Sequence, residues 1–156
     1  MAGQKKEETK RRIVLASGTF DLLHLGHVKF LEEAKKAGGR NAKLIVIVAR
    51  DSTVEKRKAK KPIMSENQRR ALVESLKVVD EAILGYEKFD IEKVIEKIKP
   101  EIIVVGYDQG GMEQTVKKYI EEQGLKIKIV RIGKFEEDEL DSSSKIKQKI
   151  IEHFKR

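Results

Sequence analysis

Residues 12–36 read RIVLASGTFDLLHLGHVKFLEEAKK and contain two of the three histidines in the chain. The first six residues are an apolar run that predicts a buried strand, and a pattern of helical period begins near Val28. Between them lie GTFD and then His24-Leu25-Gly26-His27. A strand that leads directly into a helix is the start of a β–α–β unit, so this stretch predicts a parallel sheet.

The rest of the chain repeats this alternation. Leu44–Ala49 is apolar on both faces, as expected of a strand buried between two helical layers. We therefore predict an α/β fold with a five-stranded, doubly wound parallel sheet of Rossmann-like type. Strands are expected at residues 12–17, 43–49, 81–84, 101–106 and 126–130, and helices at 28–37, 65–76, 91–98, 113–122 and from about 143. Ligands of such sheets bind beyond the carboxyl ends of the strands, which directs attention to the loops after the first and fourth strands.

Composition narrows the class of protein. A length of 156 residues fits one domain, expected at 13–156, preceded by a basic tail at 1–12 that we expect to be disordered. The net charge of +8 favours an anionic partner, either phosphate compounds or nucleic acid. The absence of cysteine excludes disulfides and thiolate chemistry. No long apolar run or signal-peptide pattern is present, so a cytoplasmic location is expected.

The first loop carries the strongest chemical signal. A helix N-terminus offers unpaired N–H groups and a positive dipole end to a phosphate. His24 and His27 can donate hydrogen bonds to phosphoryl oxygens, and Gly26 lets the backbone approach closely. The alternatives are a capped helix or a metal pair, but a zinc site would need a third ligand, and only His153 is left among the histidines.

Three further segments could join this site. Asp108 follows the fourth strand and could accept from a ribose or a base, or it could belong to an ordinary glycine turn. The segment EKRKAKKPIMSENQRR is strongly basic, and within it we favour Lys61 and Arg69 as phosphate ligands over a merely solvated charge run. Three consecutive serines open the last helix as caps or as phosphate ligands: Ser142, Ser143 and Ser144.

Together, GTFDLLHLGH, SENQRR, VVGYDQ and DSSSKIK resemble, in this order, the motifs of the cytidylyltransferase-like (HxGH) nucleotidyltransferases. The resemblance implies that an acceptor phosphate attacks the α-phosphorus of a nucleoside triphosphate and releases pyrophosphate, with a divalent metal on the triphosphate and no covalently bound cofactor. It implies catalytic roles for His24, His27, Lys61 and Arg69. The implied nucleotide-binding residues are Gly18, Thr19, Phe20, Asp21, His24, Leu25, Gly26, His27, Asp108 and Ser142, Ser143 and Ser144.

Within this superfamily, GTFDLLHLGHVKFLEEAKK, LIVIVARDSTV and VVGYDQ look most like the archaeal FAD synthases, which transfer AMP from ATP to FMN. The resemblance implies ATP and FMN as partners, no nucleic acid, no membrane and a homodimer. The stretch from Arg131 to Asp141, with Phe135 as a stacking candidate, would form the flavin end. The archaeal enzymes carry cysteines in this region, whereas this chain has none. The alternatives are a cytidylyltransferase for a small phosphorylated alcohol or sugar, and a basic nucleic-acid-binding module.

Overall fold

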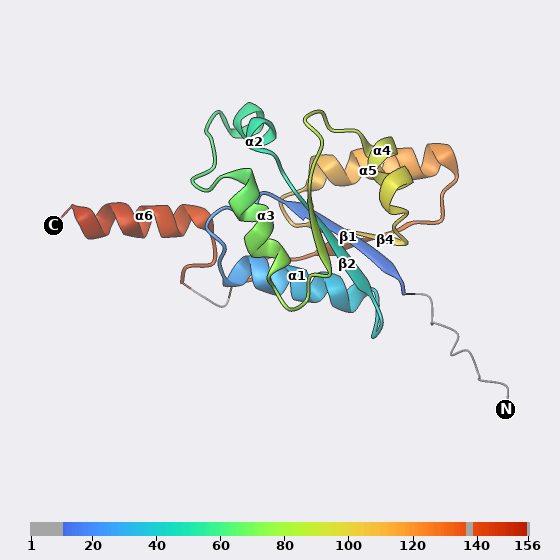
Figure 1. The fold of residues 1–156 in the computed structure, drawn as a ribbon, viewed down its shortest axis with the longest axis horizontal. Helices are drawn as coiled ribbons and strands as arrows, with labels where there is room; N and C mark the ends of the chain where they lie inside the picture. The colour runs from blue at the N-terminus through green and yellow to red at the C-terminus, as the bar shows by residue number, and fades with distance from the viewer. Residues whose placement is uncertain (1–10, 137–138, 156) are drawn as a thin grey trace.

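The computed structural model describes residues 11–136 and 139–155 (Figure 1). Its centre is one sheet of five parallel strands in the order β3-β2-β1-β4-β5. The strands are β1 (Ile13–Gly18), β2 (Lys43–Val48), β3 (Glu81–Leu84), β4 (Ile102–Gly106) and β5 (Lys128–Ile132). The order turns back between β1 and β4, which confirms the doubly wound α/β fold and places its switch point directly after β1.

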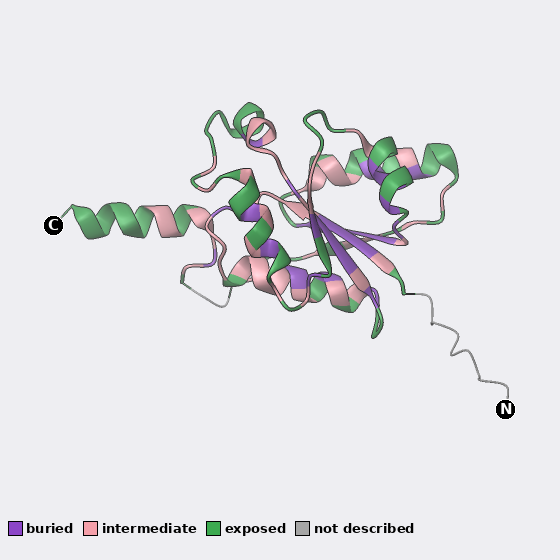
Figure 2. Ribbon diagram, in the orientation of Figure 1, coloured by how far each residue is buried: buried purple, intermediate pink, exposed green. Residues whose placement is uncertain are grey.

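Helices cover both faces of the sheet. They are α1 (Leu25–Ala37), α2 (Asp51–Lys58), α3 (Glu66–Glu74), α4 (Ile91–Ile98), α5 (Gly110–Gln123) and α6 (Ser143–Phe154). Alternate strand residues face opposite layers: Val14 and Ala16 pack with residues of α1 and α3, and Leu15 packs with residues of α4 and α5. The strands are accordingly the most buried part of the molecule, as Figure 2 shows.

Some predicted boundaries were wrong in informative ways. The first helix begins at Leu25, three residues earlier than its apolar period, because His24 caps it. The basic run after β2 forms α2, which we did not predict; α2 has one buried residue, Val54, so it has no apolar stripe to recognise. The fifth strand is shifted to Lys128–Ile132. Predicted strand 81–84 and helix 91–98 match β3 and α4.

The sheet opens at its carboxyl edge between β1 and β4. The β1–β2 pairing runs from Ile13↔Lys43 to Gly18↔Val48, whereas the β1–β4 pairing contains only Val14↔Ile102 and Leu15↔Ile103. The Gln109 side chain crosses this opening: its Nε2 donates to the carbonyl oxygen of Ser17, and its Oε1 accepts from the N–H of Gly106. A crevice bounded by the ends of β1 and β4 is the place where doubly wound sheets bind ligands.

The two ends of the chain differ in their contacts. Residues 1–10 of the predicted tail lie outside the described residues, but Arg11 is held by the fold, because its guanidinium donates to the carbonyl oxygen of Ala42 and to Asp80. Helix α6 extends away from the body of the molecule and has no buried residue (Figure 1). Within the described ranges, no helix has the length and apolar character needed to cross a membrane.

Candidate active site

The turn between β1 and α1 is strained and fixed. Phe20 and Leu22 have φ angles of 54° and 50°, which costs a residue other than glycine about 1–2 kcal/mol. The Phe20 ring is buried and lies over Gly18, where an added Cβ would come within 2.9 Å of the ring. Strain of this kind persists only where the surroundings over-determine the conformation, and it gathers at functional sites. Phe20 therefore belongs to the hydrophobic core and fixes the shape of the turn from inside the fold.

The two histidines of the turn are held through their Nδ1 atoms. The N–H of Gly26 donates to Nδ1 of His24 at 3.0 Å, and the N–H of His24 donates to Nδ1 of His27 at 3.3 Å. The rings stack with their centroids 3.7 Å apart. Because each Nδ1 accepts a hydrogen bond, a neutral imidazole must carry its proton on Nε2. Both rings thus present an N–H donor at the N-terminus of α1.

Burial keeps both imidazoles neutral near pH 7. Loss of solvent lowers the pKa of His24, although the negative charge of Asp141 acts in the opposite direction. Burial, followed by the charges of His24 and Lys58, lowers the pKa of His27 to about 3. A neutral donor loses less solvation on burial than an imidazolium, and it can still stabilise a developing oxyanion through a hydrogen bond.

The C-terminal serine motif meets the turn through Gly26. An added Cβ at Gly26 would lie 2.8 Å from the carbonyl oxygen of Asp141 and 2.8 Å from the His24 ring. Ser142 caps α6, because its hydroxyl accepts from the N–H of Lys145. Ser143 and Ser144 are the first residues of this helix. The N-termini of α1 and α6 therefore lie close together. The sequence singled out the histidine motif and the serine motif separately and did not show that they meet.

Asp21 ties the basic segment to the turn. Its buried carboxylate accepts from the backbone N–H groups of Ile63 and Met64 at 2.8 and 3.0 Å. The Nζ of Lys147 on α6 lies 3.9 Å away. The carboxylate is thus occupied with protein groups, and Asp21 acts on the site by holding its parts together.

Arg69 does not lie where a phosphate ligand was expected. Its side chain has 0% exposure, and its guanidinium donates to the carbonyl oxygens of Thr19, Ala49 and Met64 and to the carboxylate of Asp51. Those bonds would have to break before Arg69 could touch a phosphate. The predicted role of Arg69 as a phosphate ligand is therefore corrected to a structural role. Its buried guanidinium supports the β1–α1 turn by donating to the carbonyl oxygens that follow β1 and β2, which would otherwise lack a donor.

Other cations of the basic segment do approach the turn. Arg57 donates from Nη2 to Oγ1 of Thr19 at 3.4 Å, and Lys58 is close enough to lower the pKa of His27. Lys61 is exposed in the loop that follows α2. The sequence led us to favour Lys61 among several similar residues, and it gave no reason to prefer Arg57 or Lys58. Which of these cations approach the β1–α1 turn depends on the helical conformation of α2, which was not predicted.

The end of β4 supplies the other wall of the crevice. Tyr107 and Asp108 are exposed directly after the strand, and Arg131 of β5 donates to the carbonyl oxygen of Tyr107. Gln109, which bridges β1 and β4, was quoted in the motif but given no role. Phe135 is half-buried beyond β5. Asp108 is thus exposed at the switch point, unlike the buried Asp21, and its Oδ1 lies 3.1 Å from the place where a Cβ on Gly106 would stand.

The acidic and histidine side chains do not form a resident metal site. Among the residues that the structure describes, no group of three or more His, Asp or Glu side chains is placed to hold an ion. Asp21 and Asp51 already bind protein donors.

A doubly wound parallel sheet with two histidines at the N-terminus of the helix that follows β1 is the arrangement expected of an α/β nucleotidyltransferase. The cytidylyltransferase-like family model matches residues 15–149, and the chain belongs to this family.

Relatives and solved structures agree with this assignment. The chain is 53% identical to a FAD synthase of Methanobrevibacter smithii over 88% of this chain and 89% of that protein. It is also 53% identical to a FAD synthase of Ferroglobus placidus, over 88% and 87%. A crystal structure described as a lipopolysaccharide core biosynthesis protein, from Thermoplasma volcanium, shares 47% identity with a TM-score of 0.73 and covers 81% of this chain and 100% of that one. These matches confirm the family resemblance stated from the motifs and the fold predicted from the alternation of strands and helices.

Proposed function

We propose that this chain is a FAD synthase that transfers AMP from ATP to FMN. An oxygen of the FMN phosphate forms a bond to the α-phosphorus of ATP while the bond from that phosphorus to the β-phosphate oxygen breaks, so pyrophosphate leaves. The observation that carries the proposal is the pair of neutral Nε2–H donors on His24 and His27 at the start of α1. The archaeal FAD synthases at 53% identity support FMN as the acceptor.

The protein contributes electrostatic stabilisation and positioning. Negative charge builds on the oxygens around the α-phosphorus as the bond to the leaving phosphate lengthens. Fixed donors aimed at those oxygens act strongly because they need no reorganisation during the step. His24 and His27 fill this role, and Arg57, Lys58 and Lys61 offer positive charge to the β- and γ-phosphates. Arg69 is a positioning residue in this scheme.

The remaining predicted site residues keep the roles that the family motifs imply. Asp108 accepts from the adenosine, next to Gln109 at the opening of the sheet. The phosphates lie along the turn and the start of α6, next to Gly18, Thr19, Leu25, Gly26, Ser142, Ser143 and Ser144, while Phe20 and Asp21 hold the turn in place from within the fold. ATP enters with its divalent metal already bound to the phosphates. Residues 13–156 act as one domain in the cytoplasm, and we expect a homodimer.

The competing functions have less support. A cytidylyltransferase for a polyol or sugar phosphate shares the fold, but the relatives named above are FAD synthases. A nucleic-acid-binding module is disfavoured because Arg57 and Lys58 of the basic run turn toward the histidine turn.

A matrix of ATP or CTP against FMN or glycerol 3-phosphate, with Mg²⁺ and pyrophosphate release as the readout, tests the proposal. We expect release with ATP and FMN, together with FAD detected by chromatography. Release with CTP and glycerol 3-phosphate, and none with ATP and FMN, would show that the acceptor and the nucleotide are both wrong.

A further inference from the structure

The loop after β3 exposes aromatic side chains in a protein that has few. The chain contains five Phe and three Tyr, and two of these fall in the segment GYEKFD at residues 85–90. Phe89 is 58% exposed and Tyr86 is 40% exposed. Partly exposed aromatic rings that line a hollow are a common mark of a site for a flat ligand, because the rings gain contacts when the ligand covers them.

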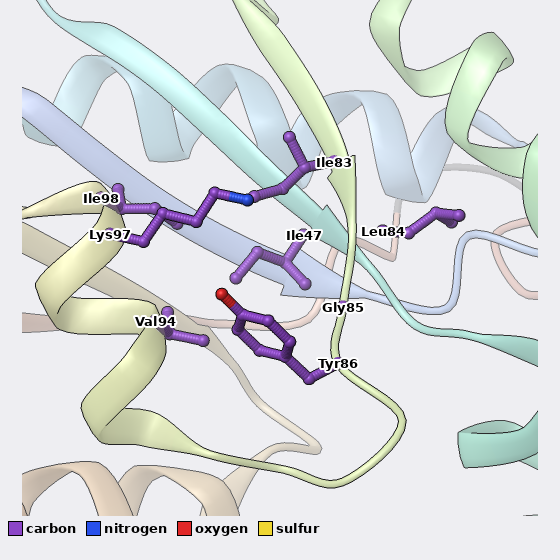
Figure 3. Close-up of a pocket in the computed structure, with 8 residues that line it drawn as sticks. All are labelled: Ile47, Ile83, Leu84, Gly85, Tyr86, Val94, Lys97 and Ile98. Atoms are coloured by element: carbon purple, nitrogen blue, oxygen red, sulfur yellow. The ribbon is translucent and has the colours of Figure 1, made fainter.

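The two rings differ in how they are held. Figure 3 shows Tyr86 turned toward Ile47 and Val94 at the edge of the core, while the neighbouring Leu84 points the other way. Lys93 of α4 places its Nζ 5.8 Å from the centre of the Tyr86 ring. Tyr86 is thus a fixed wall supported by the core, and Phe89 is the exposed ring of the same loop.

These side chains line an open groove with a volume of about 570 Å³. Residues 86–90 form one side, and Arg50 and Lys93 complete it. This volume lies within the range that holds drug-sized ligands. The lining combines two aromatic rings with cations and with the carboxylates of Glu87 and Asp90, so it offers an apolar surface together with hydrogen-bonding groups to a large planar ring system.

The groove is connected to the histidine turn through the end of β2. Arg50 donates from Nε to the carbonyl oxygen of Gly85, and the N–H of Ala49, one residue earlier, donates to the carbonyl oxygen of Gly18. In the sheet, β3 lies two strand spacings from β1, or about 10 Å. The ribityl phosphate of FMN separates the ring system from the attacking oxygen by a comparable length.

Asp108 and Tyr107 lie on the opposite side of β1, after β4. If adenosine occupies that side, the side of β2 and β3 is open to the acceptor, whose attacking oxygen must lie in line with the bond to the leaving pyrophosphate. The groove is on this side, and Phe135 is on the other.

We infer that the groove formed by residues 86–90, Arg50 and Lys93 binds the isoalloxazine ring of FMN, with Phe89 stacking on it and Tyr86 as its inner wall. This inference rests on the proposed function and deepens it. It moves the flavin end from the stretch 131–141, where sequence analysis had placed it, to the β3–α4 loop.

Phe89→Ala tests the groove with the full chain. Loss of a stacking ring weakens binding of a planar base by about 10-fold or more. We expect the KM for FMN to rise by at least this factor while the KM for ATP stays unchanged. Riboflavin carries the same ring but lacks the attacking phosphate, so it should inhibit competitively against FMN, with a Ki that rises in parallel. Phe154→Ala, at the exposed end of α6, is the matched control and should leave both KM values unchanged.

Three results would count against the inference. An unchanged KM for FMN in Phe89→Ala, with FAD still formed, overturns it alone. An increase in Phe135→Ala in place of Phe89→Ala also overturns it, and locates the flavin beyond β5. Failure of the unaltered protein to form FAD from ATP and FMN refutes the proposed function and this inference with it.

Discussion

Two loops at the same edge of the sheet are built in opposite ways. The β1–α1 turn keeps strained φ angles at Phe20 and Leu22 because hydrogen bonds to both imidazoles and the buried guanidinium of Arg69 hold it in place. The β3–α4 loop leaves the Phe89 ring more than half exposed, and only Tyr86 of its two rings is supported by the core. A group that stabilises a transition state must be fixed before the substrate arrives, whereas a surface that receives a ring gains its contacts on binding. The comparison predicts that substitutions in and beneath the turn affect stability and rate, and substitutions in the loop affect acceptor affinity alone.

The largest effect is expected beneath the turn. Arg69→Met removes four hydrogen bonds and leaves the carbonyl oxygens of Thr19, Ala49 and Met64 without this donor, so the free energy of unfolding should fall by about 3–5 kcal/mol. Urea titration followed by circular dichroism measures it. Arg70→Met on the same helix is the control, because the Arg70 side chain is partly exposed and its ion pair with Glu74 is worth less than about 1 kcal/mol. Equal losses in the two variants would show that Arg69 is no anchor.

Removal of either imidazole should slow transfer. His27→Ala deletes one Nε2 donor, and His24→Asn keeps an acceptor for the helix cap, while its shorter amide side chain places no donor at the position of Nε2. We expect kcat to fall by about 100-fold or more in each, as for other transition-state donors, measured by pyrophosphate release. His153→Ala, on the exposed end of α6, should retain the full rate. Full rates in the two turn variants would leave these histidines as structural caps only.

Gly26 is where the turn meets α6. In Gly26→Ala the new methyl group would overlap the carbonyl oxygen of Asp141 and the His24 ring. We expect a loss of about 1–3 kcal/mol in the free energy of unfolding and a rate about 10- to 100-fold lower, because the donors shift. Gly111→Ala is the control, since no atom lies within 4 Å of its added Cβ and alanine favours a helix. A thermal melt and a rate assay on both variants decide the outcome.

The buried imidazole also makes stability depend on pH. The pKa of His27 is about 3 in the fold and near 6.5 when unfolded, so between these values the unfolded chain binds one more proton. Its contribution to stability is therefore present above about pH 6.5 and is lost as the pH falls, by about 1.4 kcal/mol per pH unit. Urea titrations from pH 7 to pH 5 should show this slope reduced in His27→Ala and kept in His153→Ala. The same slope in both variants would mean that His27 is readily protonated in the fold.

The smallest effect is expected in the loop. Phe89→Ala should change the free energy of unfolding by less than about 0.5 kcal/mol, because the ring is exposed. Phe20→Ala, which empties a buried position, should cost about 3–5 kcal/mol. A large loss in Phe89→Ala would mean that the loop, like the turn, is part of the packed structure.

Much of the site could be predicted because it depends on local pattern. Apolar runs with helical segments between them determine a parallel sheet, and the carboxyl ends of its strands collect the loops that follow. His24, Gly26 and His27 lie at such a loop, so their place could be read without coordinates. Helix α2 could not be predicted in this way, because it has no apolar stripe.

By itself the sequence determined the fold class, the family and the position of the histidine turn, since these follow from periodicity and from residues close together in the chain. Only the tertiary structure decided that Arg69 is buried while Arg57 and Lys58 face the turn, because these side chains differ in packing and not in chemistry. The tertiary structure also showed that Gly26 packs closely against the backbone of Asp141 and that two partly exposed aromatic rings lie in the loop after β3. Contacts between segments far apart in sequence leave no periodic trace, so they appear only when the chain is folded.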